Sequence, residues 1–505
     1  MLYSETKFPQ EVIEEIFTHL TAKRYTLISF FPEIETPLKR ELLSCALACK
    51  AFSLPALRAL WHTMDSMIPL LKLLPNFKLT VDDRYVLVGS INNSTSQRFD
   101  FYSRMVKSFF HGFRDRTGNS YKLADSVYHL LSIMRPMPLP SLTRFCCVVD
   151  DPEETFHWMP LFLSASLKAA YIHVHPYFEA DLLIYLYLVK EVASSFERLV
   201  VDCQEKESTF CYLEAASQLE SLRALQLTLP RTGHNSTSLG RDIPCLGALQ
   251  HLEEIHLESR RLEHSYGHGQ EVRGHFPSLK RLYLGTDYFF ITAFLDVFRN
   301  SPLELLDVCA LGLDRDQDAC EDIFQAVVHH WSETLTSFSF DLGAHYPWAM
   351  ERSELKLSHS IETLYSLRRL KVFQLTGCSR RLYMTNKDVS TLCDAWPHLT
   401  DLKIGVRPGG QDFSPTPSSL PILFRRCRNL KRATLPLYVS NPPPLITLDW
   451  ILPSHELGKV DYIVDEDELP EPRPRGCGIS FGRCVFIFEK SGSRSCTIRL
   501  RCKEM

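Results

Sequence analysis

The feature that most constrains this chain is a short leucine-led pattern that recurs along most of its length. Clear copies are SLRALQL from Ser221, HLEEIHL from His251, SLKRLYL from Ser278, SLRRLKV from Ser366 and HLTDLKI from His398. Each copy follows the order Leu-x-x-apolar-x-apolar. With looser copies included, the first position falls at residues 142, 167, 196, 222, 252, 279, 303, 335, 367, 399, 430 and 457, and successive gaps run from 24 to 32 residues.

The pattern has a direct structural meaning. Its two later apolar positions lie two residues apart, so on a strand they point to the same side, and the leucine three residues earlier turns into the same core. The 18 to 25 residues between copies leave room for an outer helix, for example over Asp322–Leu335. Since no single repeat can bury its own apolar face, neighbouring repeats must stack.

A short motif that recurs on this period is typical of a leucine-rich-repeat solenoid. We therefore predict an α/β fold with parallel strands on the concave face and helices outside. The alternative is that leucine-rich sequence matches a degenerate pattern by chance, and twelve copies in near-regular order argue against it. The asparagine of stricter repeats is largely missing, so we expect the solenoid to be irregular.

The residues between the apolar positions of each strand should point away from the core and form a recognition face. Mixed charges with an aromatic or two suit the binding of a folded protein or a peptide through complementary charge and a few anchors. The alternative is a face that is merely solvated. The predicted target-binding residues are Glu254, His256, Arg281, Tyr283, Asp307, Arg369, Lys371, Asp401 and Lys403.

The first part of the chain has a helical pattern in place of the repeat. Pro9 can open a helix whose apolar face runs through residues 12–20, with glutamates in its first turns that suit the helix dipole. A second helix is expected over residues 42–52, a third from Pro55 through Trp61, and a fourth over 67–74. These elements make a thin core, so an apolar face left for a partner is plausible.

The N-terminal segment resembles an F-box in an ordered set of motifs: Phe8-Pro9, Ile16-Phe17, Ala48-Cys49-Lys50-Ala51-Phe52 and Leu60-Trp61. The continuation LWHTMDSMIPLLKLLP is similar to fungal F-box proteins with degenerate leucine-rich repeats. Residues 21–40 are longer than the usual connection between the first two F-box helices, so they form either an extended loop or a further short helix.

The resemblance implies that this chain is a non-catalytic substrate receptor. Its helices would dock on a Skp-type adaptor that bridges to a cullin–RING (SCF-type) ubiquitin ligase, and its repeats would hold a target protein. Carried over by position, the adaptor-binding residues are Pro9, Val12, Ile16, Leu20, Leu43, Cys49, Phe52, Leu60 and Trp61. Two alternatives remain: these residues form only the core of a small helical bundle, or the chain is a repeat scaffold with no role in ubiquitination.

The sequence predicts no catalytic residue, no metal and no cofactor. It contains no phosphate-binding loop, HExxH or CxxC motif. Cys45 and Cys49 have a helical spacing but no second pair of ligands, so both are expected to be core residues. His173 and His175 share a strand face with no carboxylate or cysteine close by, and the last four cysteines are irregularly spaced. A Cys–His pair that meets only in space is left open.

The net charge and the N-terminal sequence limit which binding partners and cellular compartments are expected. The net charge is −4 and the isoelectric point about 6.6, so no overall basic field favours nucleic acid or an anionic membrane. The start lacks a signal-peptide pattern, which predicts a cytoplasmic or nuclear protein with reduced cysteines. The expected domains are F-box-like helices at 1–66, linking helices and first irregular repeats at 67–140, the solenoid at 141–465, and an acidic, proline-rich loop with capping strands at 466–505.

Overall fold

The structure is a computed structural model in which the chain forms two compact units, Met1–Thr228 (unit 1) and Leu229–Met505 (unit 2). No helix in the described part of the chain is long and apolar enough to cross a membrane. The described residues are 9–21, 36–89, 93–111, 122–148, 158–173, 179–203, 212–229, 243–259, 274–311, 318–342, 354–356, 361–408, 414–437, 459–462, 479–481, 484–490 and 496–502.

Unit 1 begins with three helices, α1 (Gln10–Thr21), α2 (Thr36–Ala48) and α3 (Lys50–Trp61). The second predicted helix was too long, because α2 ends at Ala48 and Cys49 is the N-cap of α3. Pro55 does not open a helix either; it is buried inside α3. The predicted insertion at 21–40 is only partly described, since residues 22–35 lie outside the described residues and the rest belongs to α2.

Parallel strands follow directly in unit 1. Their order is β1 (Thr63–Met64), β4 (Ser108–His111), β6 (Arg144–Val148), β7 (Ala169–His173), β8 (Arg198–Asp202) and β9 (Ala224–Leu229). The helical elements are α4 (Ile68–Leu71), α5 (Asn93–Ser103), α6 (Asp125–Met134), η1 (Met159–Phe162), α7 (Glu179–Val192) and α8 (Tyr212–Ala216). A small side sheet holds β2 (Phe77–Leu79), β3 (Arg84–Leu87) and β5 (Lys122–Leu123).

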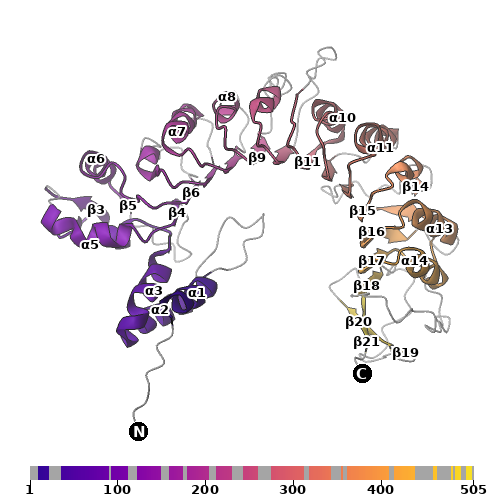
Figure 1. Cartoon of the computed structure of the whole chain (residues 1–505), viewed down its shortest axis with the longest axis horizontal. Coiled ribbons are helices and arrows are strands. Elements are labelled where there is room, and N and C mark those ends of the chain that lie inside the picture. Colours follow the sequence, from indigo (N-terminus) through magenta and orange to yellow (C-terminus); the bar gives the residue numbers. More distant parts are fainter. Residues whose placement is uncertain are drawn as a thin grey trace, which may run out of the picture. The chain divides into compact units, whose positions relative to one another are not determined.

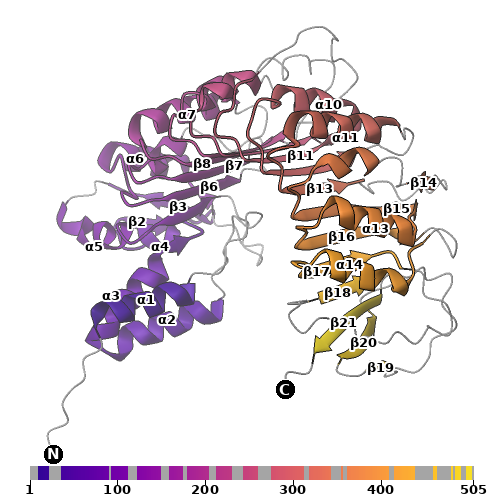
Figure 2. The ribbon, with the colours of Figure 1, turned by 45° about the vertical axis from the view of Figure 1, so that its right-hand side comes forward.

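Unit 2 continues the same architecture. Its parallel strands are β10 (Glu254–Ser259), β11 (Arg281–Asp287), β12 (Leu305–Leu311), β13 (Ser337–Asp341), β15 (Val372–Tyr383), β16 (Asp401–Pro408), β17 (Arg432–Leu435) and β18 (Lys459–Tyr462), with β14 (Glu354–Lys356) beside β15. Its helical elements are η3 (Ile243–Ala248), α10 (Tyr288–Val297), α11 (Asp318–Trp331), η5 (Thr363–Ser366), α13 (Asn386–Ala395), η7 (Pro417–Ser419) and α14 (Leu420–Arg426). Figure 1 shows α10, α11, α13 and α14 on one side of these strands, and Figure 2 shows the same layering from another angle.

The predicted leucine-rich-repeat solenoid is confirmed by this ladder of parallel strands with helices on one face. Most predicted leading positions are fully buried, including Leu142, Leu252 and Leu430. Two residues after each of these positions except Leu367 a strand begins, so the apolar pattern sets the strand register. The position at 457 lies outside the described residues.

The predicted register of one repeat is wrong. The motif from Ser366 predicted Leu367 as the leading position, but β15 begins only at Val372. Val372 pairs with Ser337 on one side and Asp401 on the other, which makes Leu370 the true equivalent of Leu399. Leu367 and Leu370 are both buried, because both pack into the core of that turn.

Threonine hydroxyl groups add to the hydrogen bonds that link neighbouring repeats. The carbonyl just before each strand accepts two backbone N–H groups from the next repeat, as Lys371 does from Thr400 and Asp401. The hydroxyl of Thr400 donates to the same carbonyl at 3.1 Å, and Thr336 does so to Glu304 at 3.0 Å. Backbone and side-chain bonds therefore link each repeat to its predecessor at the point where the strands start.

The end of the chain forms the predicted pair of strands. β20 (Cys484–Lys490) and β21 (Cys496–Cys502) pair antiparallel, and β19 (Ile479–Phe481) joins β20 on its other side. The acidic, proline-rich stretch at 466–478 lies outside the described residues.

Candidate functional site

The three N-terminal helices have a small core with apolar side chains left outside it. Ile13 and Phe17 of α1 pack with Leu42, Ala46, Ala56 and Ala59 of the other two helices. Other apolar residues of α1 and α2 are exposed to solvent: the exposed fraction is 51% for Ile16 and 79% for Leu47. The exposed large apolar residues of these helices are Val12, Ile16, Leu43, Leu47, Phe52 and Leu54. Several large apolar groups exposed on so small a segment are typical of an interaction surface.

Two further contacts hold the three helices together. Arg58 of α3 donates to the Glu14 carboxylate of α1 at 2.6 Å. The ring of Phe52 meets Phe17 edge-on with centroids 6.0 Å apart. Phe52 therefore contributes one side to the helical core and leaves the other side exposed.

The predicted adaptor-binding residues divide into two groups. Pro9, Val12, Ile16, Leu43, Cys49 and Phe52 are exposed, as a docking surface requires. Leu60 packs against the helical core. Trp61 stacks on Tyr102 of α5 at 4.8 Å. The side chain of Leu20 lies outside the described residues. Leu60 and Trp61 are therefore half-buried residues engaged within the chain, and Leu47 and Leu54 are exposed apolar residues that the sequence reasoning missed.

Cys45 and Cys49 differ in their surroundings. Cys45 packs against the helical core as predicted, while Cys49 is exposed between α2 and α3. Cys49 was expected to be a core residue, but the helix break at this position turns its side chain outward.

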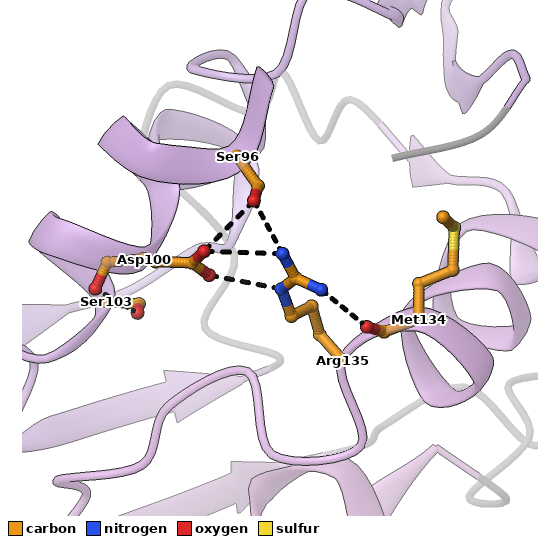
Figure 3. A network of polar contacts seen from close by, with 5 residues as sticks. All are labelled: Ser96, Asp100, Ser103, Met134 and Arg135. Carbon is orange, nitrogen blue, oxygen red and sulfur yellow. Dashed lines mark hydrogen bonds and ion pairs between the residues drawn. The ribbon is translucent and has the colours of Figure 1, made fainter. Parts of the chain in front are cut away.

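A polar network holds α5, the helix that contacts Trp61. Arg135 at the end of α6 donates to both carboxylate oxygens of Asp100, at 3.1 and 3.3 Å. It also donates to the Ser96 hydroxyl at 2.5 Å and to the Met134 carbonyl at 2.9 Å (Figure 3). Through α5, this network supports the contact between the three helices and the first repeats.

The strand face that points away from the helices is more regularly open in β11 to β13 of unit 2 than in β6 and β8 of unit 1. In unit 1, side chains on the face away from the helical core are also buried, for example Cys146 and Val200. In β11, β12 and β13, burial alternates strictly, and the residues that point away from the helices remain at least partly exposed. The open face of unit 2 is therefore available to a partner.

The predicted residues of β10 to β12 come together on this face. Glu254 pairs with Arg281 at 3.0 Å, and the rings of His256 and Tyr283 stack at 5.5 Å. Asp307 continues the same row, because His256, Tyr283 and Asp307 are register partners. Four of the predicted target-binding residues, Arg281, His256, Tyr283 and Asp307, thus form one patch, whereas Glu254 is buried beneath it and was wrongly expected to be exposed.

The patch has an acidic character. Burial lowers the pKa of His256, so its ring is neutral at neutral pH even though nearby carboxylates oppose the shift. Burial, with a smaller contribution from Asp341, raises the pKa of Asp307. Burial and the carboxylates of Asp341, Asp307 and Glu258 together raise the pKa of Cys309 to about 11. Cys309 is therefore a thiol with little nucleophilic character.

The predicted residues of the later repeats are arranged differently. Asp401 and Lys403 lie on the open face of β16, and Asp401 forms an ion pair with Arg432. Arg369 and Lys371 had been placed on that face, but they precede β15 and lie exposed at its N-terminal edge. Val372 and Gln374 occupy the face positions in their place, because the register starts at Leu370.

Among the described residues, one small cluster joins a histidine, a carboxylate and a tyrosine. The Nδ1 atom of His173 lies 3.0 Å from the Asp202 carboxylate, which also accepts a bond from the Tyr171 hydroxyl at 3.2 Å. The sequence reasoning missed this carboxylate because it belongs to the next strand. His175 lies outside the described residues. The part of the chain that the structure describes contains no group of three or more His, Cys, Asp or Glu side chains that could hold a metal ion.

Comparisons with known proteins find only distant structural likeness. No protein-family model matches it, and no curated protein matches its sequence. Among solved structures it is similar to the leucine-rich repeat-containing protein LegL7 of Legionella pneumophila, with 12% identity, a TM-score of 0.32, and 53% of this chain and 84% of that chain covered. An internalin (inlF) of Listeria monocytogenes has 10% identity, a TM-score of 0.29 and coverage of 86% and 99%. TLR13, from a TLR13–ssRNA13 complex, has 11% identity, a TM-score of 0.30 and coverage of 73% and 54%. The leucine-rich-repeat fold is assigned from the strand ladder of the chain itself.

Proposed function

We propose that this chain is a protein-interaction scaffold whose two ends bind different partners, and that it acts as the substrate receptor of a cullin–RING ubiquitin ligase. The repeats hold a target protein on the open face of unit 2. The three N-terminal helices dock on a Skp-type adaptor, as the resemblance to an F-box implies. The chain itself carries no catalytic group in this scheme, and its mechanism is proximity: it raises the effective concentration of a target lysine beside the charged conjugating enzyme.

The observation that carries the proposal is the apolar surface of α1 to α3. Val12 and Ile16 lie one helical turn apart, as do Leu43 and Leu47, and all four are exposed beside a small core. Fully burying a side chain of this size contributes about 1.5–3 kcal/mol, so even half-exposed groups supply a useful part of a binding free energy. The exposed residues overlap the positions that the F-box resemblance assigns to adaptor contact.

The test is a binding assay between the purified full chain and a Skp-type adaptor, by pull-down and calorimetry. Wild-type protein is expected to bind, and Ile16→Asp/Leu47→Asp is expected to lose about a hundredfold in affinity, because two buried apolar contacts become desolvated carboxylates. Ile133→Asp is the control, since Ile133 is also an exposed isoleucine but lies on α6, away from the three helices. Circular dichroism establishes that each protein is folded.

Failure of the wild-type protein to bind any Skp-type adaptor would overturn the ligase role. The chain would then stand as a repeat scaffold that binds a target without a role in ubiquitination. Equal losses in the double variant and the control would show that the apolar surface of the three helices is not where the adaptor docks.

A further inference from the structure

Unit 2 is strongly polarised along its stack of repeats. Residues 243–342, which include β10 to β13, contain sixteen Asp and Glu against seven Lys and Arg, a net charge of −9. Residues 361–437, which include β15 to β17, contain thirteen Lys and Arg against five Asp and Glu, a net charge of +8. A chain with an overall charge of −4 thus concentrates positive charge in a few consecutive repeats.

The cations of these repeats gather where the strands begin. Lys371 and Lys431 occupy equivalent positions just before β15 and β17, because the Thr400 amide bonds to the Lys371 carbonyl and the Lys431 amide to the Thr400 carbonyl. Lys403 points from the middle strand, β16, and pairs in register with Gln374 of β15. Since neighbouring strands lie about 4.8 Å apart, Lys371 and Lys431 are separated by about 10 Å of backbone.

Five of these cations form no ion pair with the described residues of unit 2. Arg432 pairs with Asp401 and Arg426 with Asp394. Across the described part of unit 2, no ion pair involves Lys371, Lys403 or Lys431, and the same holds for two exposed arginines, Arg369 and Arg428. Unpaired, exposed charges of one sign in adjacent repeats create a field that favours an oppositely charged ligand.

We propose that the exposed cations at the edge of β15 to β17 bind an acidic segment of the target protein, rich in Asp and Glu. The proposal deepens the scaffold role proposed above and does not depend on adaptor docking. A long polyanion such as nucleic acid fits poorly, because the repeats immediately before carry a net negative charge that would repel it. A short acidic segment gains the attraction of the cations without meeting that repulsion.

The test uses fluorescence anisotropy with the full chain and a labelled peptide of about ten residues made of glutamate and serine, which spans about 33 Å when extended. Binding is expected to weaken as salt rises, since exposed charges are screened within about 10 Å at 0.1 M. The triple reversal Lys371→Glu/Lys403→Glu/Lys431→Glu should lower affinity by about tenfold or more.

Two controls keep the result interpretable. Lys280→Glu is the matched control, because Lys280 occupies the same position before β11 and is also exposed, but lies among the acidic repeats. It is expected to change affinity by less than about twofold. The neutral triple variant Lys371→Gln/Lys403→Gln/Lys431→Gln should give an intermediate affinity, and substitutions at exposed positions such as these leave the fold intact.

Three outcomes would overturn the proposal: unchanged binding in the triple reversal, equal binding of a matched lysine–serine peptide, or tighter binding of duplex DNA than of the acidic peptide. Adaptor binding is measured on the same preparations. The triple reversal should leave it unchanged, and Ile16→Asp/Leu47→Asp should leave binding of the acidic peptide unchanged, so failure of one proposal is distinguishable from failure of the other.

Discussion

The network around Arg135 should be the strongest polar contact between α5 and α6. Replacing Arg135 with Met removes four hydrogen bonds while keeping most of the apolar stem of the side chain. Hydrogen bonds to charged groups contribute about 1.5–3 kcal/mol in buried settings. Here 23% of the Arg135 side chain and 36% of the Asp100 side chain are exposed, so water offsets part of that loss. We expect a loss of about 2 kcal/mol for Arg135→Met, with a coupling energy to Asp100 of about 1–1.5 kcal/mol.

The coupling is measured by a double-mutant cycle of Arg135→Met and Asp100→Ala. Two compact units make global unfolding a poor two-state process, so the readout is amide hydrogen exchange in α5 and α6. The pair Lys168–Glu197 is the control, because its side chains are 56% and 45% exposed and a coupling of no more than about 0.5 kcal/mol is expected. An Arg135–Asp100 coupling no larger than that of the control pair would refute the reasoning.

Three further changes have defined outcomes. Trp331→Phe should lower stability by about 1–2 kcal/mol, measured by hydrogen exchange in α11, because the buried indole donates to the Ser301 carbonyl at 3.0 Å. Burial lowers the pKa of His111 to about 4 in the folded protein, so as pH falls below 6.5 the unfolded state binds a proton before the folded state does. The stability of the region around β4 should therefore drop by about 2 kcal/mol between pH 7 and 5, and by less in His111→Phe. Gly377→Ala should lower local stability by about 1–3 kcal/mol, measured by hydrogen exchange in β13 and β15, because the new Cβ would lie 2.5 Å from the Leu342 Cβ; unchanged exchange there would contradict the packing of Gly377 against Leu342.

The repeat fold was predictable because the apolar pattern reports burial directly. Leading leucines such as Leu252 and Leu279 are fully buried, and each strand begins two residues later. The exception at Leu367 has a physical cause: Leu367, Leu370 and Val372 satisfy the same pattern in one register, and Leu370, Phe373 and Leu375 satisfy it in another. Only pairing with the neighbouring strands decides between them.

The interaction surfaces were less predictable, because they depend on how elements pack. On α1, both Ile13 and Ile16 fit an apolar face, but only packing against α2 and α3 buries the first and leaves the second exposed. Trp61 was expected to face a partner, yet Tyr102, distant in sequence, stacks on it. The partner of His173 was missed for the same reason, since Asp202 lies on the following strand.

The most direct test of the account is hydrogen exchange of the full chain with and without a saturating Skp-type adaptor. We expect slower amide exchange in α1, α2 and α3, where the exposed apolar residues lie, when the adaptor is bound. We expect no change in β10 to β17, which are proposed to bind the target. Protection confined to the repeats, or none anywhere in the chain, would contradict the division of labour between the helical segment and the repeat face.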